Sequence, residues 1–315
     1  MENKKIATRE SYGNALAELG REKENLVVLD ADLAEATKTA IFRAAFPERH
    51  IDCGIAECNM IGIAAGLAAS GKVPFASSFA MFAAGRAFEQ VRNSVGYPHL
   101  NVKIAATHAG ISVGEDGATH QCNEDIALMR TIPGMTVICP CDDIEARAAV
   151  RAAYEHQGPV YLRFGRLPVP VINDGPDYQF ELGKGIVLRE VPGGANLTIV
   201  TTGLCVPACL EAAEKLEQKG IHAEVINIHT IKPIDAALLI YQAKRSRRVV
   251  TVEEHSVIGA LGSAVSEVLS EYCPVPVHRI GMRDVFGESG PAEELLAKYG
   301  LDAEGIEKEI LTWLV

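Results

Sequence analysis

The sequence predicts an α/β protein built of two domains of the three-layer αβα type, and three observations lead to this fold class. The chain has 315 residues, which is enough for two domains at roughly 150 residues each. Short runs rich in β-branched residues alternate with longer helical patterns, as is typical of βαβ units around a mostly parallel sheet. Two such series occur, with a segment rich in Pro, Gly and Asp between them. We therefore expect one domain over residues 1–175 and a second over residues 176–315.

The first series predicts a mostly parallel sheet with helical connections. Its strands are short runs of β-branched and other apolar residues, such as LVVLD. Such runs are found at 26–30, 73–77, 101–106, 136–140 and 160–164. Between them, longer segments of small or amphipathic residues predict helices. These helices are expected at 9–20, 56–69, 82–96, 123–130 and 142–156.

The second series repeats this alternation with its own strands and helices. The strands are expected at 197–203, 222–228, 248–254 and 276–281. The helices are expected at 206–219, 235–243, 260–271 and 303–314. The segment 167–194 contains PVPVINDGP and VPGG, which predict a linker or a loop at the edge of the fold. We therefore place the domain boundary near residue 175.

Composition and charge exclude several classes of function. Lys and Arg number 30 and Asp and Glu number 41, which gives a formal net charge of −11. This balance repels nucleic acid and anionic membranes, so a phosphate-bearing ligand would have to be held by a few local cations. No apolar stretch approaches the roughly 20 residues that cross a bilayer, and no export signal is expected. The eight cysteines include no C-x-x-C pair, so we expect reduced thiols in a cytoplasmic protein.

In the segment 52–69, Glu57 opens a helix whose other side chains are apolar or small, apart from Asn59. The glycine-containing approach to this helix permits close contact with a ligand or a second chain. An acidic residue in the first turn also complements the helix dipole with no further role. The residues alone leave both interpretations open.

The loop 107–121 follows the expected strand 101–106 and contains His108, Asp116 and His120. Ligands bind at the carboxyl ends of strands in open α/β sheets, and two histidines with an acid suit proton transfer and hydroxyl recognition. The alternative is a solvated turn with incidental histidines. We expect no metal site, because the histidines are twelve residues apart without further ligands at a suitable spacing.

Two further features lie at strand ends. Phe79 and Phe82 are three residues apart at a strand-to-helix junction, where aromatic side chains either join the core or provide a stacking surface. Arg163 lies near the end of the expected strand VYLRF, where an arginine either forms a surface ion pair or binds phosphate through two parallel hydrogen bonds.

Together and in this order, these motifs resemble the C-terminal half of a transketolase. Residues 54–60 resemble the glutamate-bearing motif of the family, residues 78–82 its aromatic pocket, and residues 114–121 its donor-binding loop. Residues 198–264 are similar to the C-terminal domain of the family. The resemblance covers the whole chain and implies a thiamine pyrimidine-binding domain followed by a transketolase C-terminal-like domain.

The resemblance implies an enzyme that depends on thiamine diphosphate and transfers a two-carbon ketol unit from a ketose to an aldose. Glu57 would share a proton with N1′ of the aminopyrimidine. Phe82, with Phe79 beside it, would stack on that ring. Asp116 and His120 would contact the hydroxyl groups of the donor ketose, and His120 would also assist proton transfer.

The resemblance further implies that His108, Arg163 and Arg9 hold the phosphate of the sugar substrate. One departure concerns this group: the position expected to carry a phosphate-binding serine is Ala36. Two other departures concern the pyrimidine pocket. Cys58 stands where the family commonly has Gln, and Gly85 stands where many members have an aromatic residue.

The sequence contains no Gly-Asp-Gly triplet, the motif with which this family holds the diphosphate through Mg²⁺. We therefore expect the Mg²⁺ ligands on a partner, an N-terminal transketolase subunit, and two chains of each kind in an α2β2 heterotetramer. The small-residue helix 61–69 is a candidate for the contact between the two copies of this chain.

Three alternatives remain at this point. The beta subunit of the decarboxylating component of 2-oxoacid dehydrogenases has a similar size and domain order, and deoxyxylulose phosphate synthase has related motifs. A non-catalytic paralogue on the same scaffold is the third.

Overall fold

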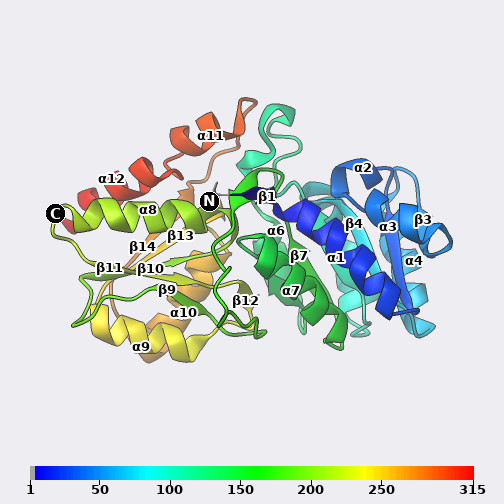
Figure 1. Ribbon diagram of the computed structural model, residues 1–315, viewed down its shortest axis with the longest axis horizontal. Helices are drawn as coiled ribbons and strands as arrows, with labels where there is room; N and C mark the ends of the chain where they lie inside the picture. Colours follow the sequence, from blue (N-terminus) through cyan, green and yellow to red (C-terminus); the bar gives the residue numbers. More distant parts are fainter. Residues whose placement is uncertain (1–3) are drawn as a thin grey trace.

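The computed structural model describes residues 4–315 and shows two α/β units side by side (Figure 1). Each unit has a central sheet with helices on both faces, which confirms the predicted fold class. No helix in this part of the chain is long and apolar enough to cross a membrane.

The first sheet has seven strands in the order β12-β6-β7-β5-β4-β2-β3. Every neighbouring pair is parallel except β12 with β6. The strands are β2 (Leu26–Asp30), β3 (His50–Asp52), β4 (Val73–Phe79), β5 (Lys103–Thr107), β6 (Thr136–Ile138), β7 (Val160–Arg163) and β12 (Thr230–Lys232). A short antiparallel pair, β1 (Lys5–Ala7) with β8 (Pro168–Pro170), lies outside this sheet.

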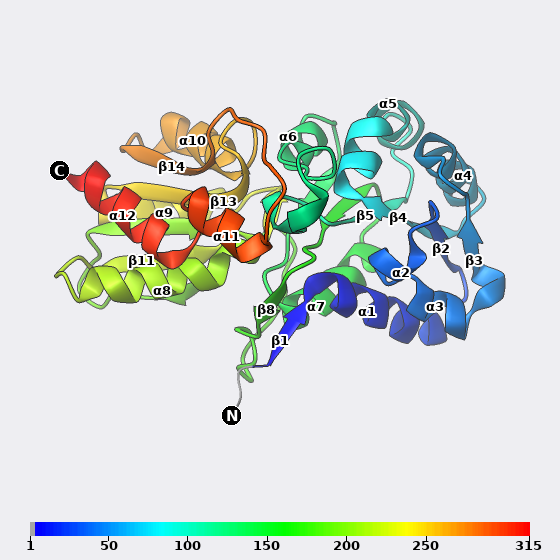
Figure 2. The same ribbon diagram turned by 90° about the horizontal axis from the view of Figure 1, so that it is seen from above.

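Helices cover both faces of the first sheet because its strands are apolar on both sides. Leu26 and Val28 of β2 pack in one core cluster, and Val27 and Leu29 pack in another, as the alternation of side chains along a strand requires. Figure 2 shows α1 and α7 on one side of the sheet and α4 and α5 on the other. The helical segments are α1 (Thr8–Glu22), α2 (Ala34–Thr37), α3 (Ala40–Ala45), η1 (Pro47–Arg49), α4 (Glu57–Ala69), η2 (Met81–Arg86), α5 (Phe88–Gln90), η3 (Val91–Gly96), η4 (Ile111–Asp116), α6 (Asp125–Arg130) and α7 (Asp143–Glu155).

The second sheet has five strands in the order β14-β13-β10-β11-β9, and only β9 is antiparallel to its neighbour. Figure 1 shows α8 and α12 above this sheet and α9 and α10 below it. The strands are β9 (Ile186–Arg189), β10 (Leu197–Thr201), β11 (Ala223–Asn227), β13 (Val249–Ser256) and β14 (Val277–Met282). The helices are η5 (Gly203–Cys205), α8 (Val206–Glu217), α9 (Ala236–Ser246), α10 (Leu261–Tyr272), α11 (Ala292–Lys298) and α12 (Ala303–Leu314).

The structure differs from the sequence-based elements mainly where segments are short or irregular. The helix expected at 82–96 is divided into the π-helical turns η2 and η3 around the short α5. Strands β3, β9 and β12 have three or four residues each, too few to show a period in the sequence. Although β12 follows the linker, it extends the first sheet, so the two halves of the chain are interlocked.

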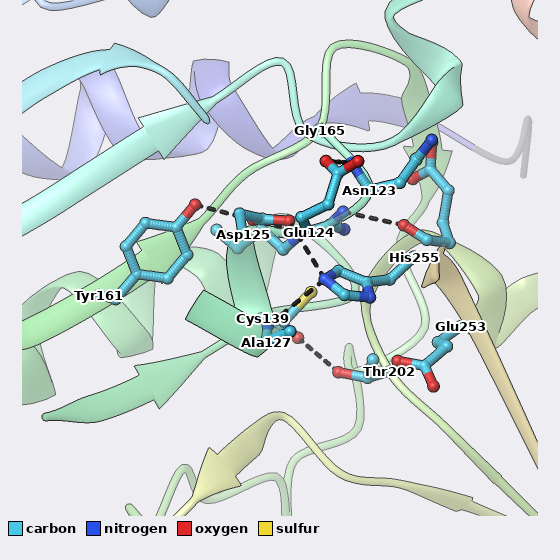
Figure 3. Close-up of polar contacts among 12 residues, drawn as sticks. Asn123, Glu124, Asp125, Ala127, Cys139, Tyr161, Gly165, Thr202, Glu253 and His255 are labelled. Atoms are coloured by element: carbon cyan, nitrogen blue, oxygen red, sulfur yellow. Dashed lines mark hydrogen bonds and ion pairs between the residues drawn. The ribbon is translucent and has the colours of Figure 1, made fainter. Parts of the chain in front are cut away.

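A buried polar cluster joins the two units (Figure 3). Asp125 Oδ2 accepts hydrogen bonds from the Tyr161 hydroxyl at 2.7 Å and from Arg163 Nε at 2.9 Å. His255, on β13 of the second unit, accepts the Ala127 N–H at 3.4 Å and lies 3.8 Å from Asp125 Oδ1. Burial lowers the pKa of His255 to about 4, so the ring is neutral at neutral pH.

Replacing His255 with Gln should make the free energy of unfolding less sensitive to acid. The ring takes up a proton near pH 6.5 in the unfolded chain but only near pH 4 in the fold, so its contribution to stability is lost as the pH falls through this window. The stability difference between the wild type and the variant should narrow by on the order of 2 kcal/mol between about pH 7.5 and about pH 5. Urea unfolding at both pH values measures this, and a constant difference would contradict it.

Candidate active site

The parallel register of the first sheet places several predicted site residues at one edge. Phe79, the last residue of β4, is aligned with Thr107, the last residue of β5, and His108 follows directly. Strand β2 pairs with the opposite edge of β4, and Asp30 at the end of β2 is aligned with Ser77 of β4. The carboxyl ends of parallel strands therefore meet here, which is where open α/β sheets bind ligands.

Four of the predicted residues form one cluster of rings at this edge. The Phe79 and His108 rings are stacked with centroids 3.9 Å apart, and Phe79 and Phe82 are nearly parallel with centroids 5.9 Å apart. His120 meets the Phe82 ring edge-on at 5.5 Å. The loop 107–121 therefore folds back so that both of its histidines contact the aromatic pair.

Glu57 is the first residue of α4, and only 2% of its surface is exposed. Its Oε2 atom accepts a hydrogen bond from Arg86 Nη1 at 2.8 Å. The guanidinium of Arg86 also lies 4.9 Å from the centroid of the Phe82 ring. One side chain thus links the carboxylate to the aromatic pair, so Glu57, Arg86 and Phe82 form one cluster.

No pattern in the sequence indicates that Arg86 contacts Glu57, although Arg86 follows Gly85 in the segment that contains the aromatic pair. The structure also accounts for the two departures in this pocket. A Cβ atom at Gly85 would lie 2.2 Å from the methyl group of Met81, so Met81 fills the space beside this position. Cys58 donates from its thiol to the backbone carbonyl of Arg86 at 3.6 Å.

His108 is a neutral hydrogen-bonding residue and not a cation. Arg9 can only donate, so its contact of 2.9 Å with His108 Nε2 leaves the ring proton on Nδ1, which faces the Thr107 hydroxyl at 2.9 Å. Burial, followed by the charge of Arg9, lowers the pKa of His108 to about 3. His108 is therefore not one of the local cations that a phosphate would need, and its contact with the substrate phosphate stays a prediction.

Two arginines face a cleft of about 440 Å³ between the two units. Arg9 and Arg166 line it, together with Ser112 and Glu115 of the loop and residues 291–293 of the second unit. Arg166 Nη1 lies 3.1 Å from the exposed Glu115 carboxylate, and Arg9 Nε has no hydrogen-bond partner among residues 4–315. That Nε atom is itself buried, and three carboxylates, those of Glu10, Glu115 and Glu293, line the cleft beside the two arginines.

Ala36, which stands in place of the expected phosphate-binding serine, contacts Arg9 through its backbone. The Nη1 atom of Arg9 donates to the backbone carbonyl of Ala36 at 3.0 Å. This position therefore fixes the guanidinium through its main chain and adds no hydroxyl to the cleft.

Arg163 does not line this cleft. It is buried, and it donates to Asp125 from Nε and to the backbone carbonyl of Glu254 from Nη2 at 2.8 Å. Breaking such a buried pair costs about 3–5 kcal/mol, so these donors are not available to a substrate. The assignment of Arg163 to a substrate phosphate is corrected, and Arg166, three residues later, is the arginine that faces the cleft.

Asp116 and His120 lie on the outer part of the loop. Asp116 is exposed at the end of η4, and His120 is half-buried, with Nδ1 3.0 Å from the Thr119 hydroxyl. The backbone turns between them, since the His120 N–H donates to the Gly117 carbonyl. The His120 ring contacts the aromatic pair and so is placed for contact with a ligand that rests on it, and the roles of Asp116 and His120 stay predictions.

The site fits one end of thiamine diphosphate better than the other. A buried carboxylate beside parallel aromatic rings suits the aminopyrimidine, which has both a proton-accepting nitrogen and a flat face. A diphosphate needs Mg²⁺, which is held by carboxylate and amide oxygens. Within residues 4–315, no three His, Cys, Asp or Glu side chains are grouped to hold a metal ion.

Comparisons with known proteins identify the family that the chain is similar to. The pattern of the transketolase pyrimidine-binding domain matches residues 4–171, and that of the transketolase C-terminal domain matches residues 183–306. A putative transketolase C-terminal section from Methanocaldococcus jannaschii is 54% identical over 96% of this chain and 95% of its own length. A 6-deoxy-6-sulfo-D-fructose transketolase subunit from a Clostridium species is 47% identical over 95% of this chain and 91% of its own.

A solved structure shows the same architecture. It is described as a split gene transketolase in an inactive beta4 tetramer, is 55% identical to this chain and covers 98% of both chains with a TM-score of 0.89. The fold, both domain patterns and these relatives agree along nearly the whole sequence. The chain therefore belongs to the transketolase family, in which it corresponds to the half formed by the pyrimidine-binding and C-terminal domains.

Proposed function

We propose that this chain is the C-terminal subunit of a split transketolase, which moves a two-carbon ketol unit from a ketose phosphate to an aldose phosphate. The observation that carries this proposal is the meeting of Glu57, the aromatic pair Phe79 and Phe82, and His120 in one cluster of contacting side chains, linked through Arg86. Thiamine diphosphate, when bound, supplies the carbanion chemistry at its C2 atom. The protein has to hold the ring, exchange its proton and orient the sugars.

Glu57 acts on the aminopyrimidine. Its ion pair with Arg86 uses Oε2, so Oε1 remains available to exchange a proton with N1′. Phe82, held parallel to Phe79, provides the flat surface against which the pyrimidine rests. Burial of the carboxylate keeps water away from this exchange.

Asp116 and His120 act on the donor sugar. His120 is only half-buried and contacts Phe82, so its ring can move a proton to or from a hydroxyl group near the reacting carbon. Asp116 has an exposed carboxylate that can accept hydrogen bonds from sugar hydroxyls.

The phosphate end of the sugar is held by Arg9 and Arg166, with His108 as a neutral partner. Both arginines face the cleft, and they supply the local positive charge that a protein with a net charge of −11 otherwise lacks. The sulfonated sugar in the name of the Clostridium relative is also an anion, so the same pair of cations suits either group.

The cofactor's diphosphate and Mg²⁺ are held by a partner, an N-terminal transketolase subunit. Relatives that this chain covers almost entirely are named as a section or a subunit of a transketolase, which supports this division. We place the contact between two copies of this chain at the outer face of α4, where Gly62 and Gly66 have no neighbouring atom within 4 Å of an added Cβ and leave room for close approach. We propose an α2β2 assembly in the cytoplasm, a reducing compartment that suits eight free cysteines.

The Glu57→Gln variant should lose most turnover in the assembled enzyme, since an amide cannot exchange a proton with N1′. Exchange of the C2 proton of bound thiamine diphosphate, followed by NMR, should slow by at least about 100-fold. Glu22→Gln, which alters an exposed ion pair on α1, is the matched control. Exchange at the wild-type rate in the Glu57 variant would refute the role of this carboxyl.

The Arg166→Ala variant should raise KM for phosphorylated sugars far more than for hydroxypyruvate, which has no phosphate. Loss of one charge-assisted hydrogen bond of about 1.5–3 kcal/mol corresponds to a change of roughly 10- to 150-fold. Arg151→Ala removes an exposed arginine from α7 and should leave both constants unchanged. Equal effects of the Arg166 variant on both substrates would show that Arg166 only holds the loop.

The isolated chain should bind thiamine diphosphate weakly and show no ketol transfer. Calorimetry with Mg²⁺ tests the binding, because the diphosphate carries most of the ligand charge and its ligands lie on the partner. Addition of an N-terminal transketolase section should restore transfer and give a complex of two chains of each kind by light scattering. Tight binding by this chain alone would contradict the proposed division.

A further inference from the structure

A buried carboxylate of the second unit reaches the loop that carries the proposed substrate residues. Glu254 lies on β13, and 3% of its surface is exposed. Its Oε1 atom accepts the backbone N–H of Ser112 at 2.6 Å. Ser112 lines the cleft and lies between His108 and Asp116 in the sequence, so this bond fixes the middle of the loop.

The loop is shaped to admit this carboxylate. Gly110 has a φ of +75°, and a Cβ atom there would lie 2.3 Å from the Glu254 carboxyl carbon. The Gly110 N–H also donates to the Cys122 carbonyl at 2.9 Å, which closes the base of the loop. Only a glycine leaves room for the main chain to rest directly on Glu254.

A second contact holds the other end of the loop. The buried Gln121 side chain donates from Nε2 to the Ile111 carbonyl at 3.2 Å and to the Glu288 carbonyl at 2.9 Å. Glu288 belongs to the second unit, in the segment that leads to α11. Both the middle and the end of the loop are therefore attached to the second unit.

Glu254 is itself held in place by Arg163. Arg163 Nη2 donates to the backbone carbonyl of Glu254 and Nε to Asp125, so the buried strand end cannot shift alone. Burial raises the pKa of Glu254, and the positive charge of Arg163 opposes this rise. Arg163 therefore holds Glu254 in the position from which the Glu254 carboxylate contacts the loop.

We propose that Glu254 is a positioning residue, through which the C-terminal domain sets the conformation of the loop that presents His108, Asp116 and His120 to the donor sugar. This inference rests on the proposed function for the roles of those three residues. The contact between Glu254 and the loop acts on substrate binding, while the proton exchange at Glu57 takes place on another element.

The neighbouring residue offers a matched control. Glu253 is also buried and acidic, but its oxygens accept the N–H groups of Leu261 and Gly262 at 2.8 Å each, at the start of α10. It therefore caps a helix of its own domain. Glu253→Gln and Glu254→Gln make the same chemical change at adjacent positions, and only the second alters the contact with the loop.

Hydrogen exchange on the isolated chain tests the contact without any need for turnover. In Glu254→Gln, the peptide 110–121 should exchange about tenfold faster than in the wild type, because the Ser112 N–H loses a charged acceptor. Glu253→Gln should leave this peptide unchanged. Equal exchange of the peptide in the wild type and in Glu254→Gln would overturn the proposal. If Glu254→Gln does not fold, Glu254→Asp, which keeps the charge on a shorter side chain, takes its place.

Kinetics of the assembled enzyme test the consequence for the substrate. Glu254→Gln should raise KM for the donor ketose about tenfold while the C2 proton exchange of the cofactor stays at the wild-type rate. The same rise in Glu253→Gln, or slowed C2 exchange in Glu254→Gln, would show a general structural effect and overturn the proposal. If the wild-type assembly transfers no ketol unit, the proposed function fails, and the hydrogen-exchange result still decides whether Glu254 orders the loop.

Discussion

Parallel pairing of β2, β4, β5 and β7 is the constraint on which the rest of the site depends. Because their carboxyl ends share one edge, the residues that follow each strand become neighbours although they are far apart in the sequence. The aromatic pair at the end of β4 thus meets the histidines that follow β5, and the second unit covers the end of β7. The chemistry is therefore assembled from loops, while the sheet fixes their spacing.

Much of this arrangement could be predicted from the sequence, because long buried strands and regular helices give clear patterns of apolar residues. β2 was predicted with its bounds, and Glu57 at the start of α4 was singled out by its apolar surroundings. Arg163 and Arg166 could not be told apart in this way. Which of the two faces a ligand depends on the second unit, which covers the end of β7 and buries Arg163 against Asp125.

The residues that the sequence did not reveal act through contacts between distant segments. Arg86 is 29 positions from Glu57, and Glu254 is 142 positions from Ser112. Neither pair has a spacing that a helix or a hairpin would create, so no local pattern indicates it. Short strands such as β12 are missed for a related reason, since three residues carry no period and their pairing is decided by the partner strand.

The position of β12 has a consequence for any attempt to divide the chain. This strand lies beyond the linker, yet it pairs with β6 and covers the outer edge of the first sheet. Lys232 adds two hydrogen bonds from Nζ to the backbone carbonyls of Arg130 and Ile132. A fragment cut near residue 175 would expose unpaired N–H and C=O groups along β6, which is a template for aggregation. The largest core cluster also contains residues of both units, from Val27 and Ile104 to Val200 and Val249, so neither unit keeps its whole core when the chain is divided.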